Sequence, residues 1–151
     1  MNLEAQGRRI VIADHDRTIL ELLQIRLSLA GYETHVERSG CAALQTIRRV
    51  RPAGLVIDCN LPELSGLGIL NTLNSSRAAA PLTLIIGYKL APSDVDNAIK
   101  LGAKDCIAKP FSGADVIERV GRMFRRHRPE QTLIPPIQRQ ALTPPPPAMM
   151  I

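Results

Sequence analysis

The segment LVIDCNLPELSG, Leu55 to Gly66, runs from an apolar stretch to a carboxylate and then into a turn-prone stretch. Its first three residues have the character of a buried strand, and Asp58 stands at the end of that strand. A buried carboxylate is costly there unless it has a partner or a function. The rest of the chain should therefore contain groups that pair with Asp58 or use it.

Strand-like and helix-like stretches alternate along the chain. Arg9 to Ala13 is rich in β-branched residues and is predicted as a strand buried on both faces. The helix that follows has its apolar stripe at Leu20, Leu23, Leu27 and Ala30. Thr18 and Glu21 fit a capping box that would start this helix, and Gly31 is placed to end it.

The same alternation continues to residue 126. Further strands are predicted at residues 33–37, 55–58, 82–86 and 105–108, and helices at residues 41–50, 67–73, 95–101 and 115–126. Strands that alternate with helices imply a parallel sheet covered on both faces, with right-handed crossovers. We predict a doubly wound α/β fold of five βα units.

Three charged residues end or follow the first, third and fifth of these strands: Asp14, Asp58 and Lys109. In an open parallel sheet, functional sites lie beyond the carboxyl ends of the strands. We therefore expect these three side chains to meet at one edge of the sheet.

At these positions the chain resembles the receiver domain of two-component response regulators. The resemblance rests on Asp14, on IDCNLPELSG and on GAKDCIAKPF, and it covers about residues 8–126. It implies a flavodoxin-like, five-stranded parallel sheet in the order 2-1-3-4-5. Residues 1–7 would form an N-terminal arm, and residues 127–151, which are rich in proline, a disordered tail.

The resemblance also implies roles for the charged residues. Asp58 would accept a phosphoryl group from a phosphohistidine, and Lys109, which precedes a usually cis Pro110, would pair with the phosphoryl oxygens. Mg²⁺ would bind Asp14, Asp58 and the backbone carbonyl of Asn60. Asp58 taken alone would be better explained as a turn or helix-capping aspartate, but the presence of Asp14 and Lys109 favours the acceptor role.

The metal site departs from the family pattern at one position. His15 stands where the family has a second acid, and imidazole is a poor ligand for Mg²⁺. Metal affinity should therefore fall, or the metal should be held through Asp16 after a small shift of the loop. His15 could also be a solvated loop residue or, as a cation, could meet the phosphoryl group directly.

Two positions that transmit phosphorylation in the family are also changed. Ile86 or Gly87 replaces a hydroxyl residue after the fourth strand, and Cys106 replaces an aromatic residue before the lysine. Neither the hydroxyl nor the ring is present, although Tyr88 could substitute. The surface should therefore respond weakly to phosphorylation.

Composition limits the other functions. The net charge is +5, but the basic residues are spread along the chain, which favours a solvated surface over nucleic-acid binding. The three cysteines lack CxxC spacing, so neither disulfides nor a zinc site are indicated. No apolar run reaches the length of about 18 residues that a membrane span needs, and no signal peptide is evident, so we expect a cytoplasmic protein.

We predict a single-domain response regulator that is not an enzyme and signals by docking, as a phosphorelay element or as a phosphate sink. Its partner would be a sensor histidine kinase or a phosphotransfer protein. The alternative is a pseudo-receiver that binds its partner independently of phosphorylation; a basic nucleic-acid-binding protein is a third, weaker hypothesis. The last strand and helices could form a docking or homodimer face with Val95, Ile99, Arg119 and Arg122, because the arginines have no intramolecular role visible in the sequence.

Overall fold

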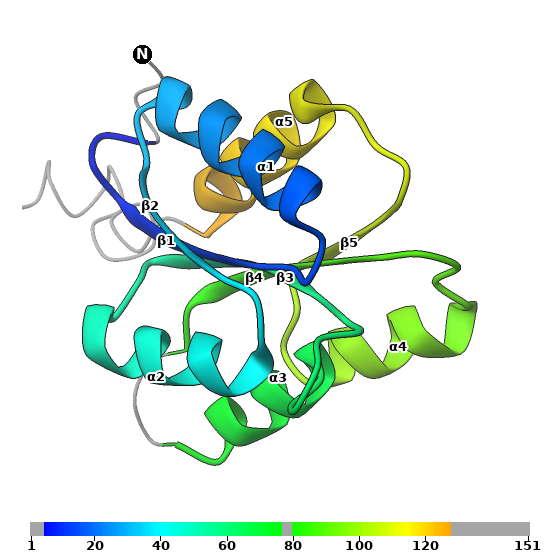
Figure 1. Ribbon diagram of the computed structural model, residues 1–151. Helices are drawn as coiled ribbons and strands as arrows, with labels where there is room; N and C mark the ends of the chain where they lie inside the picture. Colours follow the sequence, from blue (N-terminus) through cyan, green and yellow to red (C-terminus); the bar gives the residue numbers. More distant parts are fainter. Residues whose placement is uncertain (1–4, 77–79, 128–151) are drawn as a thin grey trace, which may run out of the picture.

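The computed structural model describes residues 5–76 and 80–127 and contains a five-stranded parallel sheet with five helices (Figure 1). The strands are β1 (Arg9–Ala13), β2 (Glu33–Glu37), β3 (Gly54–Asp58), β4 (Leu82–Gly87) and β5 (Asp105–Ala108). The helices are α1 (Arg17–Ala30), α2 (Gly40–Val50), α3 (Gly66–Asn74), α4 (Pro92–Lys100) and α5 (Gly113–Arg126). The strand order is β2-β1-β3-β4-β5, so the predicted fold is confirmed.

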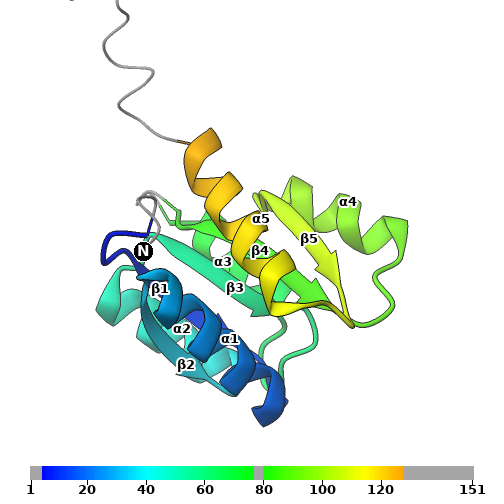
Figure 2. The same cartoon turned by 90° about the horizontal axis from the view of Figure 1, so that it is seen from above.

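Helices cover both faces of the sheet. Helices α1 and α5 lie side by side on one face, and α2, α3 and α4 cover the other (Figures 1 and 2). Alternate residues of β1 and β3 enter the two cores: Ile10, Ile12 and Val56 pack toward α1 and α5, whereas Val11 and Ile57 pack toward the opposite helices. Burial on both faces explains why β1, β3 and β4 read as largely apolar runs rather than as alternating patterns.

The start of α1 differs from the prediction. Asp16 is the N-cap, and its carboxylate accepts hydrogen bonds from the backbone N–H groups of Thr18 (2.9 Å) and Ile19 (3.4 Å). The predicted capping box of Thr18 and Glu21 was therefore wrong, because the aspartate two residues earlier satisfies the first free N–H groups. Gly31 ends the helix in a left-handed conformation with φ 109°, as predicted.

Replacing Asp16 with alanine should lower the free energy of unfolding by about 1 kcal/mol, because two N–H groups lose their acceptor. Thr18→Ala should change it by less than about 0.5 kcal/mol, since the Thr18 side chain is exposed and is not the cap. Urea denaturation of both variants checks the assignment. Equal losses in the two variants would contradict it.

The other helices begin one to three residues before their predicted starts. Ser39, Ser65 and Ser112 each cap a helix by accepting a hydrogen bond from a backbone N–H. Helix α4 begins at Pro92, and the Asp94 carboxylate accepts a hydrogen bond from the N–H of Ala91 (2.9 Å).

Except for His127, the predicted disordered tail lies outside the described residues. Within the part of the chain that the structure describes, no helix has the length and apolar character needed to cross a membrane.

Candidate functional site

The carboxyl ends of β1, β3 and β5 bring three charged side chains into contact. The Lys109 Nζ lies 2.6 Å from Asp14 Oδ2 and 2.7 Å from Asp58 Oδ2. All three residues are buried, with Asp14 fully inaccessible and Asp58 only 1% exposed. The structure therefore brings together the three residues that the sequence placed at strand ends.

The other oxygen of each carboxylate is held by the backbone. Asp14 Oδ1 accepts a hydrogen bond from the N–H of Asp16 (2.9 Å), and Asp58 Oδ1 accepts one from the N–H of Asn60 (2.8 Å). Each bond closes a local turn of the kind that aspartate favours. The turns fix both carboxylates so that their second oxygens face Lys109.

Two acids share one base in this buried cluster. Burial raises the pKa of Asp14 above its ordinary value, although the hydrogen bond to Lys109 opposes this shift. Burial lowers the pKa of Lys109, but the bonds to Asp14 and Asp58 outweigh that effect, so its pKa is raised and the amine stays charged. The cluster thus holds a protonated lysine between two carboxyl groups.

His15 lies at the open side of this cluster. Its side chain is 56% exposed, and its Nδ1 lies 3.7 Å from Asp14 Oδ1 and 3.9 Å from Asp58 Oδ2. The Arg38 guanidinium donates a hydrogen bond to the His15 carbonyl (3.1 Å), which ties the turn to the residue after β2. His15 is therefore part of the site as well as a solvated loop residue.

The oxygen and nitrogen donors here are suited to a divalent cation. One donor atom each from Asp14, His15 and Asp58 lies within 4.8 Å of the others. The carboxylates supply the hard oxygen ligands that Mg²⁺ takes, whereas imidazole is not a ligand that it favours. Asp16, the alternative ligand in the sequence, instead uses its carboxylate to cap α1 and stands outside this group.

The end of β4 carries no hydroxyl group toward the site. Ile86 is fully buried in the core beneath α1 and α5, and it pairs with Asp58 across the sheet. A Cβ atom on Gly87 would lie 2.5 Å from the Cys59 sulfur, so Cys59 fills the space beside this glycine. Cys106 is half-buried, and burial raises the pKa of its thiol to about 11. The thiol therefore stays protonated at neutral pH and offers no ring to move.

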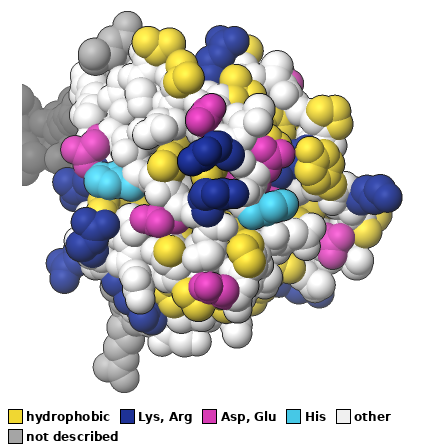
Figure 3. All heavy atoms as spheres, viewed as in Figure 1, with side chains coloured by type: hydrophobic (Ala, Val, Ile, Leu, Met, Phe, Trp, Pro, Cys, Tyr) yellow, Lys and Arg dark blue, Asp and Glu magenta, His cyan; other side chains and the backbone are white. Residues whose placement is uncertain are grey.

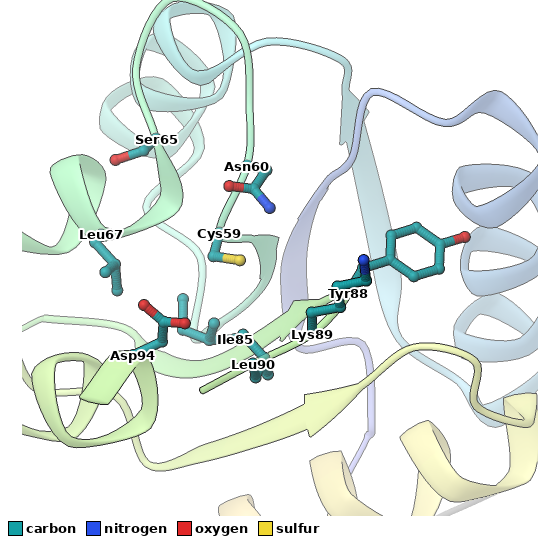
Figure 4. Close-up of a pocket in the computed structure, with 9 residues that line it drawn as sticks. All are labelled: Cys59, Asn60, Ser65, Leu67, Ile85, Tyr88, Lys89, Leu90 and Asp94. Carbon is teal, nitrogen blue, oxygen red and sulfur yellow. The ribbon is translucent and has the colours of Figure 1, made fainter. Parts of the chain in front are cut away.

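Tyr88 makes a contact that the sequence did not reveal. Its ring centroid lies 4.9 Å from Lys109 Nζ, a cation–π distance, and the residue is 53% exposed. Figure 4 shows the ring extending away from the other residues that line a neighbouring cavity of about 490 Å³, among them Cys59 and Asn60. The only sequence signal was its position just after the fourth strand. Tyr88 thus shields the lysine of the cluster.

The arginines of α5 have intramolecular partners, contrary to the interpretation of the sequence. Arg119 Nη1 lies 3.1 Å from both carboxylate oxygens of Asp105 and donates to the Cys106 carbonyl (3.1 Å). Arg122 lies 3.5 Å from Glu118 and 3.9 Å from Asp105. The sequence did not reveal these partners, because it does not show which face of α5 lies next to Asp105, the first residue of β5. On the face drawn in Figure 3, basic and acidic side chains are interspersed.

We expect Arg119→Ala to lower the free energy of unfolding by about 1 kcal/mol, because it removes a partly buried ion pair and a bond to a strand carbonyl. Arg122→Ala is the matched control and should cost less than about 0.5 kcal/mol, since its contacts are longer. Thermal denaturation measures both. A larger loss for Arg122 would contradict this ranking.

Comparisons with known proteins agree with the fold. The model of the response regulator receiver domain family matches residues 10–121. The response regulator MprA of Mycobacterium leprae is 32% identical over 122 residues, which are 81% of this chain and 53% of that protein. The chain therefore spans about half the length of the curated relatives it matches.

Solved structures show the same architecture. The receiver domain of the Francisella response regulator 1452 superposes with a TM-score of 0.73 at 26% identity, over 80% of this chain and 98% of that one. The chemotaxis response regulator CheY4 of Vibrio cholerae superposes with a TM-score of 0.72 at 20% identity, over 78% and 98% of the two chains. At that identity, the second match indicates a shared fold only.

Proposed function

Because the chain belongs to the response regulator receiver domain family, whose members act in phosphorylation-based two-component signalling, we propose that Asp58 is its phospho-acceptor. The donor would be a phosphohistidine of a sensor histidine kinase or a phosphotransfer protein. One observation carries this assignment: a buried carboxylate at the end of β3 lies 2.7 Å from the Lys109 amine. The receiver unit would span residues 8–126.

In the proposed reaction, a carboxylate oxygen of Asp58 attacks the phosphorus atom and forms an acyl phosphate. The N–P bond breaks, and the electron pair leaves with the imidazole, which takes up a proton from the solvent. Lys109 is placed to neutralise the phosphoryl oxygens as they approach two carboxylates. A divalent cation held by Asp14, Asp58 and the Asn60 carbonyl would supply further positive charge.

Access to Asp58 requires movement, because the residue is only 1% exposed. The side chains of His15 and Tyr88 border the cluster and are both more than half exposed, so they are the groups that can move aside. The proposed receiver therefore admits a phosphoryl donor from the His15 side or the Tyr88 side of the sheet edge.

Incubation with autophosphorylated histidine kinases of the host and a divalent cation tests the proposal. A labelled phosphoryl group should move to the chain, and hydroxylamine should remove the label, because acyl phosphates are cleaved by this nucleophile. If neither the kinases nor acetyl phosphate label the chain, the acceptor function is wrong.

The second candidate function is a receiver-like module that binds its partner independently of phosphorylation. Buried Ile86 and Gly87 and half-buried Cys106 favour it, because none of these residues offers a hydroxyl or a ring that could change contacts when Asp58 is modified. A ligand shifts a conformational equilibrium only through contacts that differ between the two states. For the first candidate, the phospho-accepting receiver, the proposed output is docking to a partner, transfer along a phosphorelay or capture of phosphate.

We therefore expect beryllofluoride, which stands in for the phosphoryl group on Asp58, to change amide chemical shifts mainly near the cluster. The affected segments should be residues 14–16, 58–60, 86–90 and 108–110. Comparison of ¹⁵N spectra with and without beryllofluoride measures the response. Large changes throughout residues 92–107 and 113–126 would show that the distal face switches by another route, and Tyr88→Ala would then test whether its ring transmits the change.

A further inference from the structure

The position of His15 changes which cation this site should select. Asp14, Asp58 and His15 present two oxygens and one nitrogen around a common point at the edge of the sheet. We propose that the chain prefers first-row transition-metal ions that accept imidazole, such as Ni²⁺ or Zn²⁺, to Mg²⁺. This preference concerns the same site as the proposed acceptor function, but it does not require phosphoryl transfer.

The distances between the donor atoms of this site are close to the distances between ligand atoms around a bound cation. Ligand atoms about 2.1 Å from one ion lie about 3.0–3.5 Å apart in octahedral or tetrahedral geometry. The His15 Nδ1 lies 3.7 Å from Asp14 Oδ1 and 3.9 Å from Asp58 Oδ2. An adjustment of less than about 1 Å by the exposed imidazole would complete the arrangement.

The neighbouring structure holds the backbone of His15 in this position. Its carbonyl accepts a hydrogen bond from Arg38, and the next residue, Asp16, is fixed both as the N-cap of α1 and by its N–H bond to Asp14. The imidazole therefore projects from a turn that is tied at both ends. A donor on a fixed backbone has only its side-chain freedom left to lose when it binds an ion.

The chemistry of the donors sets the preference. Mg²⁺ takes oxygen ligands and dehydrates reluctantly, whereas imidazole suits nickel, copper and zinc ions. An imidazole in place of a second carboxylate removes a negative charge, so Mg²⁺ should bind more weakly. The charged amine of Lys109, which already lies against Asp14 and Asp58, weakens the binding of every divalent ion. It therefore does not favour one metal ion over another.

Isothermal titration of the full chain with Mg²⁺ and with Ni²⁺ tests the proposal through the variant His15→Asp. The ratio of Ni²⁺ affinity to Mg²⁺ affinity should fall by about tenfold or more in the variant, since an oxygen donor replaces nitrogen. His15→Asn, which removes the imidazole without adding charge, should weaken Ni²⁺ binding by a similar factor. His35→Ala and Cys41→Ser are controls at remote exposed or half-buried donors and should leave the ratio unchanged.

A second readout identifies the ligand directly. Addition of diamagnetic Zn²⁺ should shift the imidazole ¹⁵N resonances of His15 and leave those of His35 in place. An unchanged affinity ratio in His15→Asp, unshifted His15 resonances, or Ni²⁺ affinity that survives Asp58→Asn would each overturn the proposal. Because no phosphoryl donor is present, these results are independent of whether Asp58 accepts phosphate.

Discussion

The variant Asp58→Asn should lose phosphoryl acceptance by about 100-fold or more, to the level of background label. The amide has no carboxylate oxygen to attack phosphorus, yet it retains the shape of the side chain. Its carbonyl can still accept the hydrogen bond that Asp58 Oδ1 receives from the N–H of Asn60. The measurement is label transfer from a phosphorylated kinase, compared at equal protein concentration.

Loss of label in this variant should not reflect unfolding. In the wild type two carboxylates face one lysine, and the contact of Lys109 with Asp14 (2.6 Å) does not involve the group that is changed, so it should persist in the variant. The free energy of unfolding should therefore stay within about 1 kcal/mol of the wild type. Asp16→Asn is the matched control, because asparagine also caps helices and this residue lies outside the cluster. Label retained in Asp58→Asn would assign acceptance to another residue.

The fold could be predicted largely because short strand-like runs alternate with helical stripes, and β1, β3 and β4 are buried almost throughout. Runs such as Arg9–Ala13 and Asp105–Ala108 are short, apolar or β-branched and separated by helical stripes, so their bounds match those of β1 and β5. Helix starts were less accurate, since they depend on which polar side chain reaches the first free N–H groups. Asp16 performs this role for α1, although Thr18 and Glu21 fitted the sequence motif better.

The charged centre of the site followed from topology. Strand ends in a parallel sheet meet at one edge, so Asp14, Asp58 and Lys109 could be placed together without knowledge of their rotamers. The contact of Tyr88 with Lys109 could not be predicted in this way, because it depends on the direction of a side chain in the loop after β4. The place of Tyr88 directly after β4 puts it near the site, but it does not tell which group the ring contacts.

The ion pair of Arg119 shows the same limit on the surface. The stripe of arginines on α5 was visible in the sequence, but its partner Asp105 lies on the neighbouring strand, and their pairing depends on how the helix is placed against the sheet. A docking role for this face must therefore account for Arg119 already being engaged. Reversal of its charge would break an internal contact as well as alter the surface.

Replacing Lys109 with methionine should lower the free energy of unfolding at pH 7 by about 3–5 kcal/mol, because two carboxylates would face each other in the core without a cation. The lysine side chain is 1% exposed and those of Asp14 and Asp58 are 0% and 2% exposed, so the two carboxylates are poorly hydrated once the amine is lost. Lys104→Met, at an exposed lysine before β5, is the control and should change stability by less than about 0.5 kcal/mol. Urea denaturation of the wild type, Lys109→Met and Lys104→Met measures the three free energies of unfolding.

The loss in Lys109→Met should be smaller at pH 5 than at pH 7. Burial already raises the pKa of Asp14 above 3.8 in the wild type, and removal of the lysine removes the main effect that opposes this shift. A carboxyl whose pKa is higher in the folded chain stabilises the fold below its unfolded pKa, and this contribution disappears as the pH rises through the folded value. Lowering the pH therefore protonates the cluster and restores stability. Addition of Asp58→Asn to Lys109→Met should recover part of the lost free energy of unfolding at pH 7, because one of the two facing charges is removed. If the loss is instead independent of pH and unaffected by Asp58→Asn, the lysine stabilises the fold by packing rather than by its charge.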